Sequence, residues 1–122
     1  MTHSHYFDNY RTMKQKDALA ALAALAQDTR LAVFRYLVTV GPDGAAAGEI
    51  AQALKVAAPT LSFHLKELEQ AHLVSSQRQS RSIIYSANYE RMRALLSFLM
   101  DDCCRGRPEI CNINAKRKEC TP

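Results

Sequence analysis

The chain has 122 residues, of which 48% are hydrophobic, so it suits one small domain with a modest core and excludes a largely disordered protein. Its formal net charge of +4 favours a polyanionic partner. No stretch approaches the ~20 apolar residues of a membrane span, and residues 1–11 lack the apolar run of a signal peptide. We therefore expect a cytoplasmic protein with no membrane partner.

Two helices are predicted in the first third of the chain. Residues 14–26 are rich in alanine and leucine, which are strong helix formers. Asp28 is placed to cap a second helix, which Gly41 and Pro42 end. The apolar residues spaced three and four apart are Leu19, Leu22 and Ala26 in the first helix and Leu31, Phe34, Leu37 and Val38 in the second.

A helix-turn-helix pattern follows these two helices. Residues 47–54 predict a short helix, residues 55–57 a tight turn, and a fourth helix begins near Pro59. A large aromatic residue on the outer side of this fourth helix is unusual for a face that meets only solvent. The core side of the helix carries Leu61, Leu65 and Leu68, and Leu73 continues this side beyond the helix end. The outer side carries Pro59, Thr60, Ser62, Phe63 and Lys66.

A β-hairpin is predicted after the fourth helix. Residues 73–77 and 82–86 are β-branched or polar and have the character of strands. Residues 78–81 separate them and include Arg78 and Arg81. The chain therefore places a hairpin with a basic tip directly after the helix-turn-helix.

The last predicted helix begins after Asn88, which serves as its cap, and ends near Gly106. Its apolar stripe consists of Met92, Leu95, Leu96, Leu99 and Cys103. We expect three regions: a flexible N-terminus over 1–13, a DNA-binding and dimerisation domain over 14–104, and a cysteine-containing tail over 105–122.

A helix in the major groove with a basic hairpin beside it contacts base edges and phosphates at once. Three segments in this order carry a family resemblance: residues 26–31, 58–68 and 78–85. The sequence resembles the ArsR/SmtB family of metal-responsive winged-helix repressors, and its arsenic-responsive members in particular. The resemblance covers roughly residues 15–104. It implies a mainly α fold with a β-hairpin wing (α+β), which is the winged helix-turn-helix. It also implies that the protein represses transcription and is not an enzyme.

The same resemblance implies which residues contact DNA. Residues of the fourth helix would contact bases or backbone, and the arginines of the wing would hold phosphate or the minor groove. Two positions depart from the family, because Ser80 stands where the wing tip usually has glycine, and Ala57 and Ala58 stand where a hydroxyl residue usually caps the recognition helix. The predicted DNA-binding residues are Thr60, Ser62, Phe63, His64, Lys66, Arg78 and Arg81.

The first and last helices are more apolar than a domain of this size needs. We therefore expect a homodimer in which these helices meet their own copies. Two recognition helices would then reach successive major grooves of a palindromic, double-stranded operator.

Four cysteines lie in the last twenty residues. Cytoplasmic thiols stay reduced, so these cysteines are interpreted as ligands or a redox device. Trivalent arsenic or antimony is satisfied by three sulfurs, whereas zinc usually takes four ligands. We predict that As(III) or Sb(III) is an inducer bound by Cys103, Cys104 and Cys111, with no catalytic cofactor. Cys120 could be a fourth ligand or a redox partner, but an idle thiol is the favoured interpretation.

Other functions remain open at this point. Oxidation could join Cys111 to another thiol and make the protein a redox-sensing repressor. A zinc or cadmium sensor of the same fold is a further alternative, although family members that bind these metals at the last helix use histidine and carboxylate ligands, and this helix has no histidine. A thiol reductase would need a C-x-x-C pair at a helix start, which the sequence lacks. A DNA-binding module without any ligand would be indifferent to ions and oxidants.

Overall fold

The computed structural model describes residues 13–100. The predictions for the N-terminal segment before Met13, for the far end of the last helix and for the tail lie outside the described residues, as do Cys103, Cys104, Cys111 and Cys120. The elements are α2 (Gln15–Leu25), α3 (Asp28–Val40), β1 (Ala45–Ala46), α4 (Ala47–Leu54), α5 (Ala58–Gln70), β2 (Val74–Gln79), β3 (Ser82–Ala87) and α6 (Tyr89–Met100).

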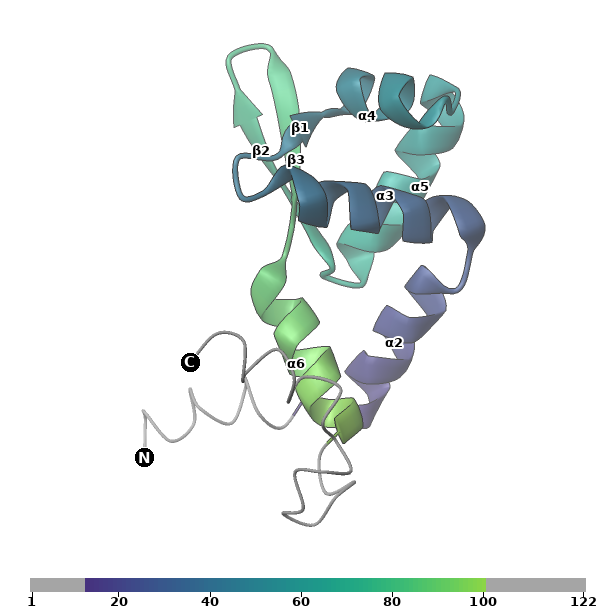
Figure 1. Ribbon diagram of the computed structural model, residues 1–122, viewed down its shortest axis with the longest axis vertical. Helices are drawn as coiled ribbons and strands as arrows, with labels where there is room; N and C mark the ends of the chain where they lie inside the picture. Colours follow the sequence, from purple (N-terminus) through teal and green to yellow (C-terminus); the bar gives the residue numbers. More distant parts are fainter. Residues whose placement is uncertain (1–12, 101–122) are drawn as a thin grey trace, which may run out of the picture.

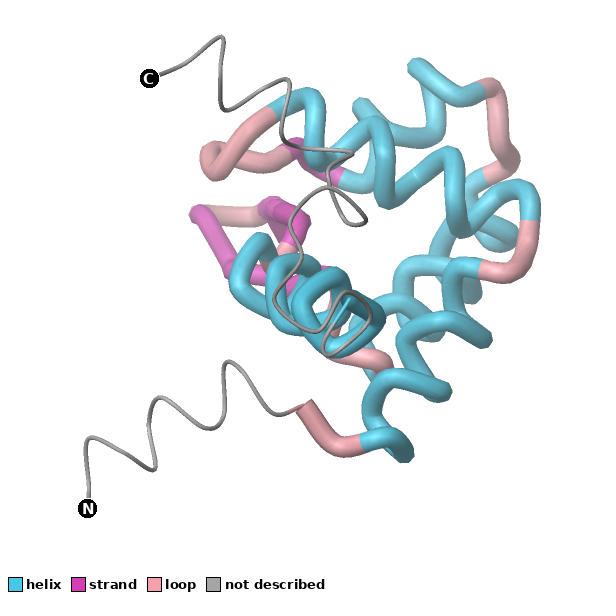
Figure 2. Tube along the Cα trace, turned by 60° about the horizontal axis from the view of Figure 1, so that its bottom comes forward, coloured by secondary structure: helices cyan, strands magenta, loops and turns pink. Residues whose placement is uncertain are grey.

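Five helices and a small sheet form a winged helix-turn-helix in the described residues, as predicted. The sheet is antiparallel with strand order β1-β3-β2. Helices α4 and α5 lie at the same end of the molecule as the β2–β3 hairpin, and α2 and α6 converge at the other end (Figure 1). Figure 2 shows the strands gathered at one side of the molecule.

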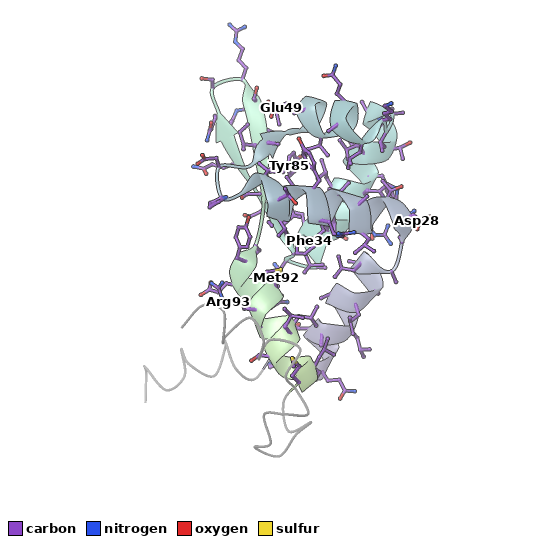
Figure 3. The ribbon with its side chains drawn as sticks, viewed as in Figure 1. Asp28, Phe34, Glu49, Tyr85, Met92 and Arg93 are labelled. Carbon is purple, nitrogen blue, oxygen red and sulfur yellow. The ribbon has the colours of Figure 1, made fainter. Side chains whose placement is uncertain are left out.

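The core lies where α3, α4 and α5 meet the base of the hairpin. Phe34 on α3 and Met92 on α6 lie in the region between these two helices (Figure 3). In α2 the small side chains Ala18 and Ala21 face the core, so Leu19 and Leu22 of this helix are exposed. The largest fully buried side chains are Leu37, Ile50, Leu61, Leu65, Leu68, Leu73, Val33 and Val74.

The caps of the helices explain their boundaries. The prediction that Asp28 caps helix α3 is wrong. The cap is Gln27, because its side chain accepts a hydrogen bond of 2.9 Å from the Arg30 amide. Helix α6 is capped by Asn88 as predicted, through a bond of 3.1 Å from the Arg91 amide to Oδ1. Helix α5 begins after Ala57, which offers no side-chain acceptor.

The hairpin differs from the prediction at its tip. Arg78 pairs with Ile83 and Gln79 pairs with Ser82, so both residues belong to β2 and only two residues form the loop. Ser80, the first loop residue, has a φ of 58°. This is the left-handed region that glycine occupies at least cost, which explains why a related wing would carry glycine here.

Strand β1 was not predicted. It has only two residues, Ala45 and Ala46, which pair with Tyr85 and Ile84 of β3. Gly44 precedes it with a φ of 73°, and a Cβ at this position would collide with the main-chain oxygen of Tyr85. The strand therefore depends on a glycine that lets two backbones approach closely.

Candidate DNA-binding interface

Helix α5 carries an exposed face on the side away from the core. We call Thr60, Ser62, Phe63 and Lys66 the reading face, because all four are exposed while Leu61, Leu65 and Leu68 are buried on the other side of the helix. Phe63 is 56% exposed. The reading face thus combines hydroxyl groups, one cation and one large apolar ring.

His64 does not share this face. Its side chain is only 8% exposed, and its Nδ1 lies 3.3 Å from Nη1 of Arg30 on α3. Since arginine only donates, Nδ1 is the acceptor and the ring proton is assigned to Nε2. The structure therefore separates His64 from the other four residues of α5 that the sequence predicts to contact DNA.

Arg30 joins three parts of the molecule. Its Nε donates a hydrogen bond of 2.6 Å to the main-chain oxygen of Ala24 in the last turn of α2. Its amide donates to Gln27, and its guanidinium reaches His64 of α5. Sequence reasoning gave Arg30 no role of its own, although it lies inside the motif at residues 26–31. Its contacts connect α2 and α3 to the helix that carries the reading face.

The wing is held against α5 by a polar contact. The Ser76 hydroxyl of β2 donates a hydrogen bond of 2.6 Å to Oε2 of Glu69. Burial, and to a lesser extent the nearby negative charge of Glu69, raises the pKa of the Tyr85 phenol on β3 above its ordinary value. Arg78 on β2 and Arg81 at the tip are both exposed. The contact between Ser76 and Glu69 therefore holds β2, the strand that carries Arg78, against the end of α5.

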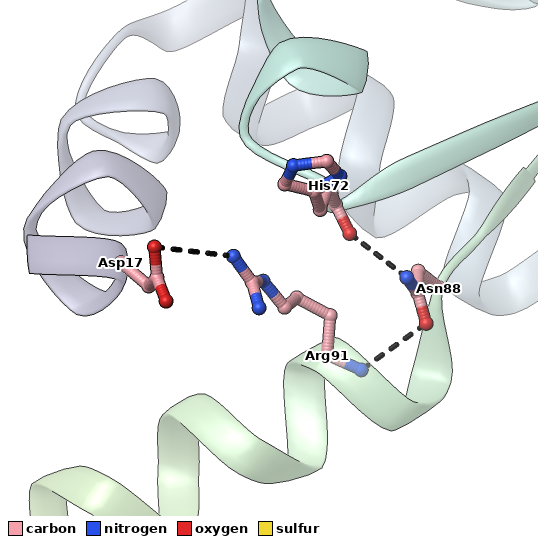
Figure 4. A network of polar contacts seen from close by, with 4 residues as sticks. All are labelled: Asp17, His72, Asn88 and Arg91. Atoms are coloured by element: carbon pink, nitrogen blue, oxygen red, sulfur yellow. Dashed lines mark hydrogen bonds and ion pairs between the residues drawn. The ribbon is translucent and has the colours of Figure 1, made fainter. Parts of the chain in front are cut away.

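A second polar network lies where α5 ends and α6 begins (Figure 4). Asn88 donates from Nδ2 to the main-chain oxygen of His72 over 3.0 Å and accepts from the Arg91 amide. Arg91 also lies 3.9 Å from a carboxylate oxygen of Asp17 on α2. The end of α5 is thereby connected to both helices at the far end of the molecule.

Those two helices expose apolar side chains. We call Leu19 and Leu22 of α2 with Leu96 and Leu99 of α6 the leucine surface, and these residues are between 39% and 58% exposed. The two helices lie beside each other, away from the hairpin (Figure 1). Several large apolar side chains exposed on two neighbouring helices of a small domain are typical of a protein interface.

Within residues 13–100, no three histidine, cysteine, aspartate or glutamate side chains come together in a way that could hold a metal ion. None of the helices in the same range is long and apolar enough to cross a membrane.

The sequence and the structure both match known DNA-binding proteins. A family profile described as a helix-turn-helix domain matches residues 25–77. The HTH-type transcriptional regulator YgaV of Escherichia coli (strain K12) is 30% identical over 89 residues, which cover 73% of this chain and 88% of that protein.

Two solved structures are similar along most of the chain. The ArsR-like transcriptional regulator from Rhodococcus sp. RHA1 is 24% identical, with a TM-score of 0.63 over 87% of this chain and 93% of that one. The DNA-binding domain of Mb0332 from Mycobacterium bovis, a possible ArsR-family regulator, is 26% identical with a TM-score of 0.57, covering 71% of this chain and 81% of that one.

This chain belongs to the ArsR family of winged helix-turn-helix regulators. It is a transcriptional regulator, and its homologues bind DNA rather than catalyse reactions. In this family the helix-turn-helix and the hairpin are the expected DNA-reading parts, so the reading face and the two wing arginines become the candidate interface.

Proposed function

We propose that this ArsR-family protein is a repressor that binds a palindromic operator as a homodimer. The observation that carries the proposal is the exposed reading face of α5, together with Arg78 and Arg81, which are exposed on the hairpin that follows this helix and is joined to its C-terminal end through Ser76 and Glu69. The face offers groups for base edges, and the arginines offer charge for phosphates or the minor groove. Thr60, Ser62, Phe63 and Lys66 would contact DNA directly, whereas His64, which is buried against Arg30, would not.

The homodimer is supported by the leucine surface. Its four leucines come from the first and last described helices, where the sequence predicts self-association. Mb0332, which has the same fold, is described as a homodimeric winged helix-turn-helix domain. A two-fold axis through this surface would give the dimer two copies of α5, one for each half of a palindrome.

The proposed inducer is As(III) or Sb(III), bound by Cys103, Cys104 and Cys111. Three thiolates match the preference of these soft ions for sulfur ligands. The doublet follows α6 closely, since Met100 is the last described residue of that helix. Binding there would alter α6 beside the proposed dimer surface, and coupling of this kind typically amounts to ~1–3 kcal/mol, with DNA weakening inducer binding equally.

The proposal is tested by fluorescence anisotropy of labelled DNA from upstream of the gene, bound by the reduced, full-length protein. Parallel titrations with arsenite, zinc and peroxide separate the inducers. Release by arsenite alone supports the proposal, whereas release by peroxide or zinc alone replaces it with redox or metal sensing by the same fold. Absence of DNA binding would overturn the repressor proposal.

The ligand assignment needs a variant and a matched control. Cys104→Ser removes one proposed sulfur ligand, so the variant should bind DNA normally and stay bound in arsenite. Cys120→Ser removes the cysteine that is not a proposed ligand and should respond like the natural protein. A Cys104→Ser protein that still leaves DNA on addition of arsenite would show that the assignment is wrong.

A further inference from the structure

Phe63 is an exposed aromatic ring at the centre of the reading face. Among the exposed large hydrophobic residues of the described chain, it is the one that α5 contributes, and the others are aliphatic. It lies on the side of α5 opposite to the buried leucines. It therefore contributes nothing to the core, and its exposure costs free energy unless a partner covers it.

The ring of Phe63 is held in place from behind. It packs edge-on against the His64 ring, with centroids 5.3 Å apart and planes inclined by 64°. His64 is buried and contacts Arg30, which is itself bound to Ala24 and Gln27. An edge-to-face pair of this separation is a favourable aromatic geometry. The exposed ring of Phe63 is thus supported by a chain of contacts that ends on α2.

The chemistry of Phe63 limits what it can recognise in DNA. A phenyl ring neither donates nor accepts the hydrogen bonds that distinguish most base edges. The apolar group that the major groove offers is the 5-methyl group of thymine, and phenylalanine is one of the side chains suited to contact it. The hydroxyl of Thr60 and the ammonium of Lys66 on the same face are suited to polar base edges and phosphates.

We propose that Phe63 determines sequence specificity by contacting the 5-methyl group of a thymine in each half-site, and that His64 and Arg30 are positioning residues for its ring. The inference rests on the proposed binding of DNA through α5. It assigns a specific base to this side chain and gives His64 a role that requires no contact with DNA.

The test replaces thymine with deoxyuridine, which removes the methyl group and keeps the base pairing. A binding site is first selected from random duplex DNA with the reduced, full-length protein. Each thymine of the selected site is then replaced singly, and the dissociation constant is measured by anisotropy. For the natural protein we expect about fourfold weaker binding at one thymine in each half-site, as for a methyl group removed from an apolar contact.

Substitutions in α5 show whether this penalty belongs to Phe63. With Phe63→Ala, the deoxyuridine site and the thymine site should bind equally. Lys66→Ala is the matched control from the same face, since it should weaken binding to all sequences and lower the salt dependence by about one phosphate contact. It should retain the fourfold difference between thymine and deoxyuridine.

The positioning residues are tested by the same ratio. His64→Gln keeps a possible acceptor for Arg30 but removes the ring beside Phe63, and Arg30→Lys keeps the charge but cannot reach Ala24 and His64 together. Each should reduce the ratio of the two dissociation constants toward one while leaving the salt dependence unchanged. A general loss of folding would instead weaken binding to both sites by the same factor.

The outcomes separate this inference from the proposed function. If the natural protein binds no DNA sequence, both fail. If it binds but no thymine shows a penalty, if the selected site contains no thymine, or if the penalty persists in Phe63→Ala, the inference fails and the repressor proposal stands. An unchanged ratio in both positioning variants would overturn the roles of His64 and Arg30.

Discussion

Asn88 donates a hydrogen bond of 3.0 Å from its side-chain amide to the main-chain oxygen of His72, and its main-chain amide donates one of 2.8 Å to the main-chain oxygen of Leu73. His72 ends the turn after α5 with a φ of 65°. The residue that caps α6 therefore also holds the end of the helix that carries the reading face. The start of α6 is thereby connected to the turn that follows α5.

Substitutions at Asn88 can separate the two roles. Asn88→Asp keeps an acceptor for the Arg91 amide but loses the donor to His72, so it should cost ~1 kcal/mol of the free energy of unfolding. Asn88→Ala loses the cap as well and should cost ~2 kcal/mol. Urea unfolding monitored by circular dichroism measures both values. Equal losses in the two variants would mean that the cap contributes nothing.

Replacing Ser80 with glycine should stabilise the wing. Ser80 has a φ of 58°, a conformation that costs an L residue ~1–2 kcal/mol and costs glycine little. Part of this gain is offset by the greater backbone entropy that glycine loses on folding, so Ser80→Gly should raise the free energy of unfolding by ~0.5–1 kcal/mol. Ser82→Gly, inside β3, is the control and should lower it. Destabilisation by Ser80→Gly would contradict the argument.

The start of α5 can also be stabilised. Ala57 occupies the cap position and provides no side-chain acceptor for the free amides of the first turn. Ala57→Ser should therefore raise the free energy of unfolding by ~1 kcal/mol, measured by denaturant titration. Ala58→Ser places the same hydroxyl one residue later, inside the helix, and should give no gain. An equal gain from both would indicate an effect unrelated to capping.

The order of the helices and the hairpin could be predicted from sequence because local signals mark their ends. Gly41 ends α3 with a φ of 101°, and Asn88 caps α6 through its side chain. Strand β1 has no such signal, since two alanines form it only because Gly44 allows a close approach to β3. Residue patterns thus located the elements that depend on neighbours in sequence, and missed the one that depends on a distant backbone.

The candidate DNA-binding residues show the same difference between features set by neighbours in sequence and features set by distant contacts. Helical periodicity correctly placed Thr60, Phe63 and Lys66 on the outer side of α5. It could not show that His64, one residue after an exposed ring, turns toward Arg30, because that contact joins residues 34 positions apart. Spacing along a helix identifies a face, whereas the partner of a side chain at the edge of that face depends on how the helices pack.

A charge placed in the leucine surface should break the proposed dimer. Leu96 is 50% exposed on α6, and a glutamate there would have to be desolvated in the proposed interface. Leu96→Glu should therefore leave each subunit folded but shift the protein from dimer to monomer in sedimentation velocity at micromolar concentration. Its affinity for a palindromic site should fall at least tenfold, because the two recognition helices would no longer bind as one unit. Leu31→Glu is the matched control, since Leu31 is 44% exposed on α3, outside the leucine surface. A Leu96→Glu protein that remains dimeric, or a Leu31→Glu protein that becomes monomeric, would place the interface elsewhere.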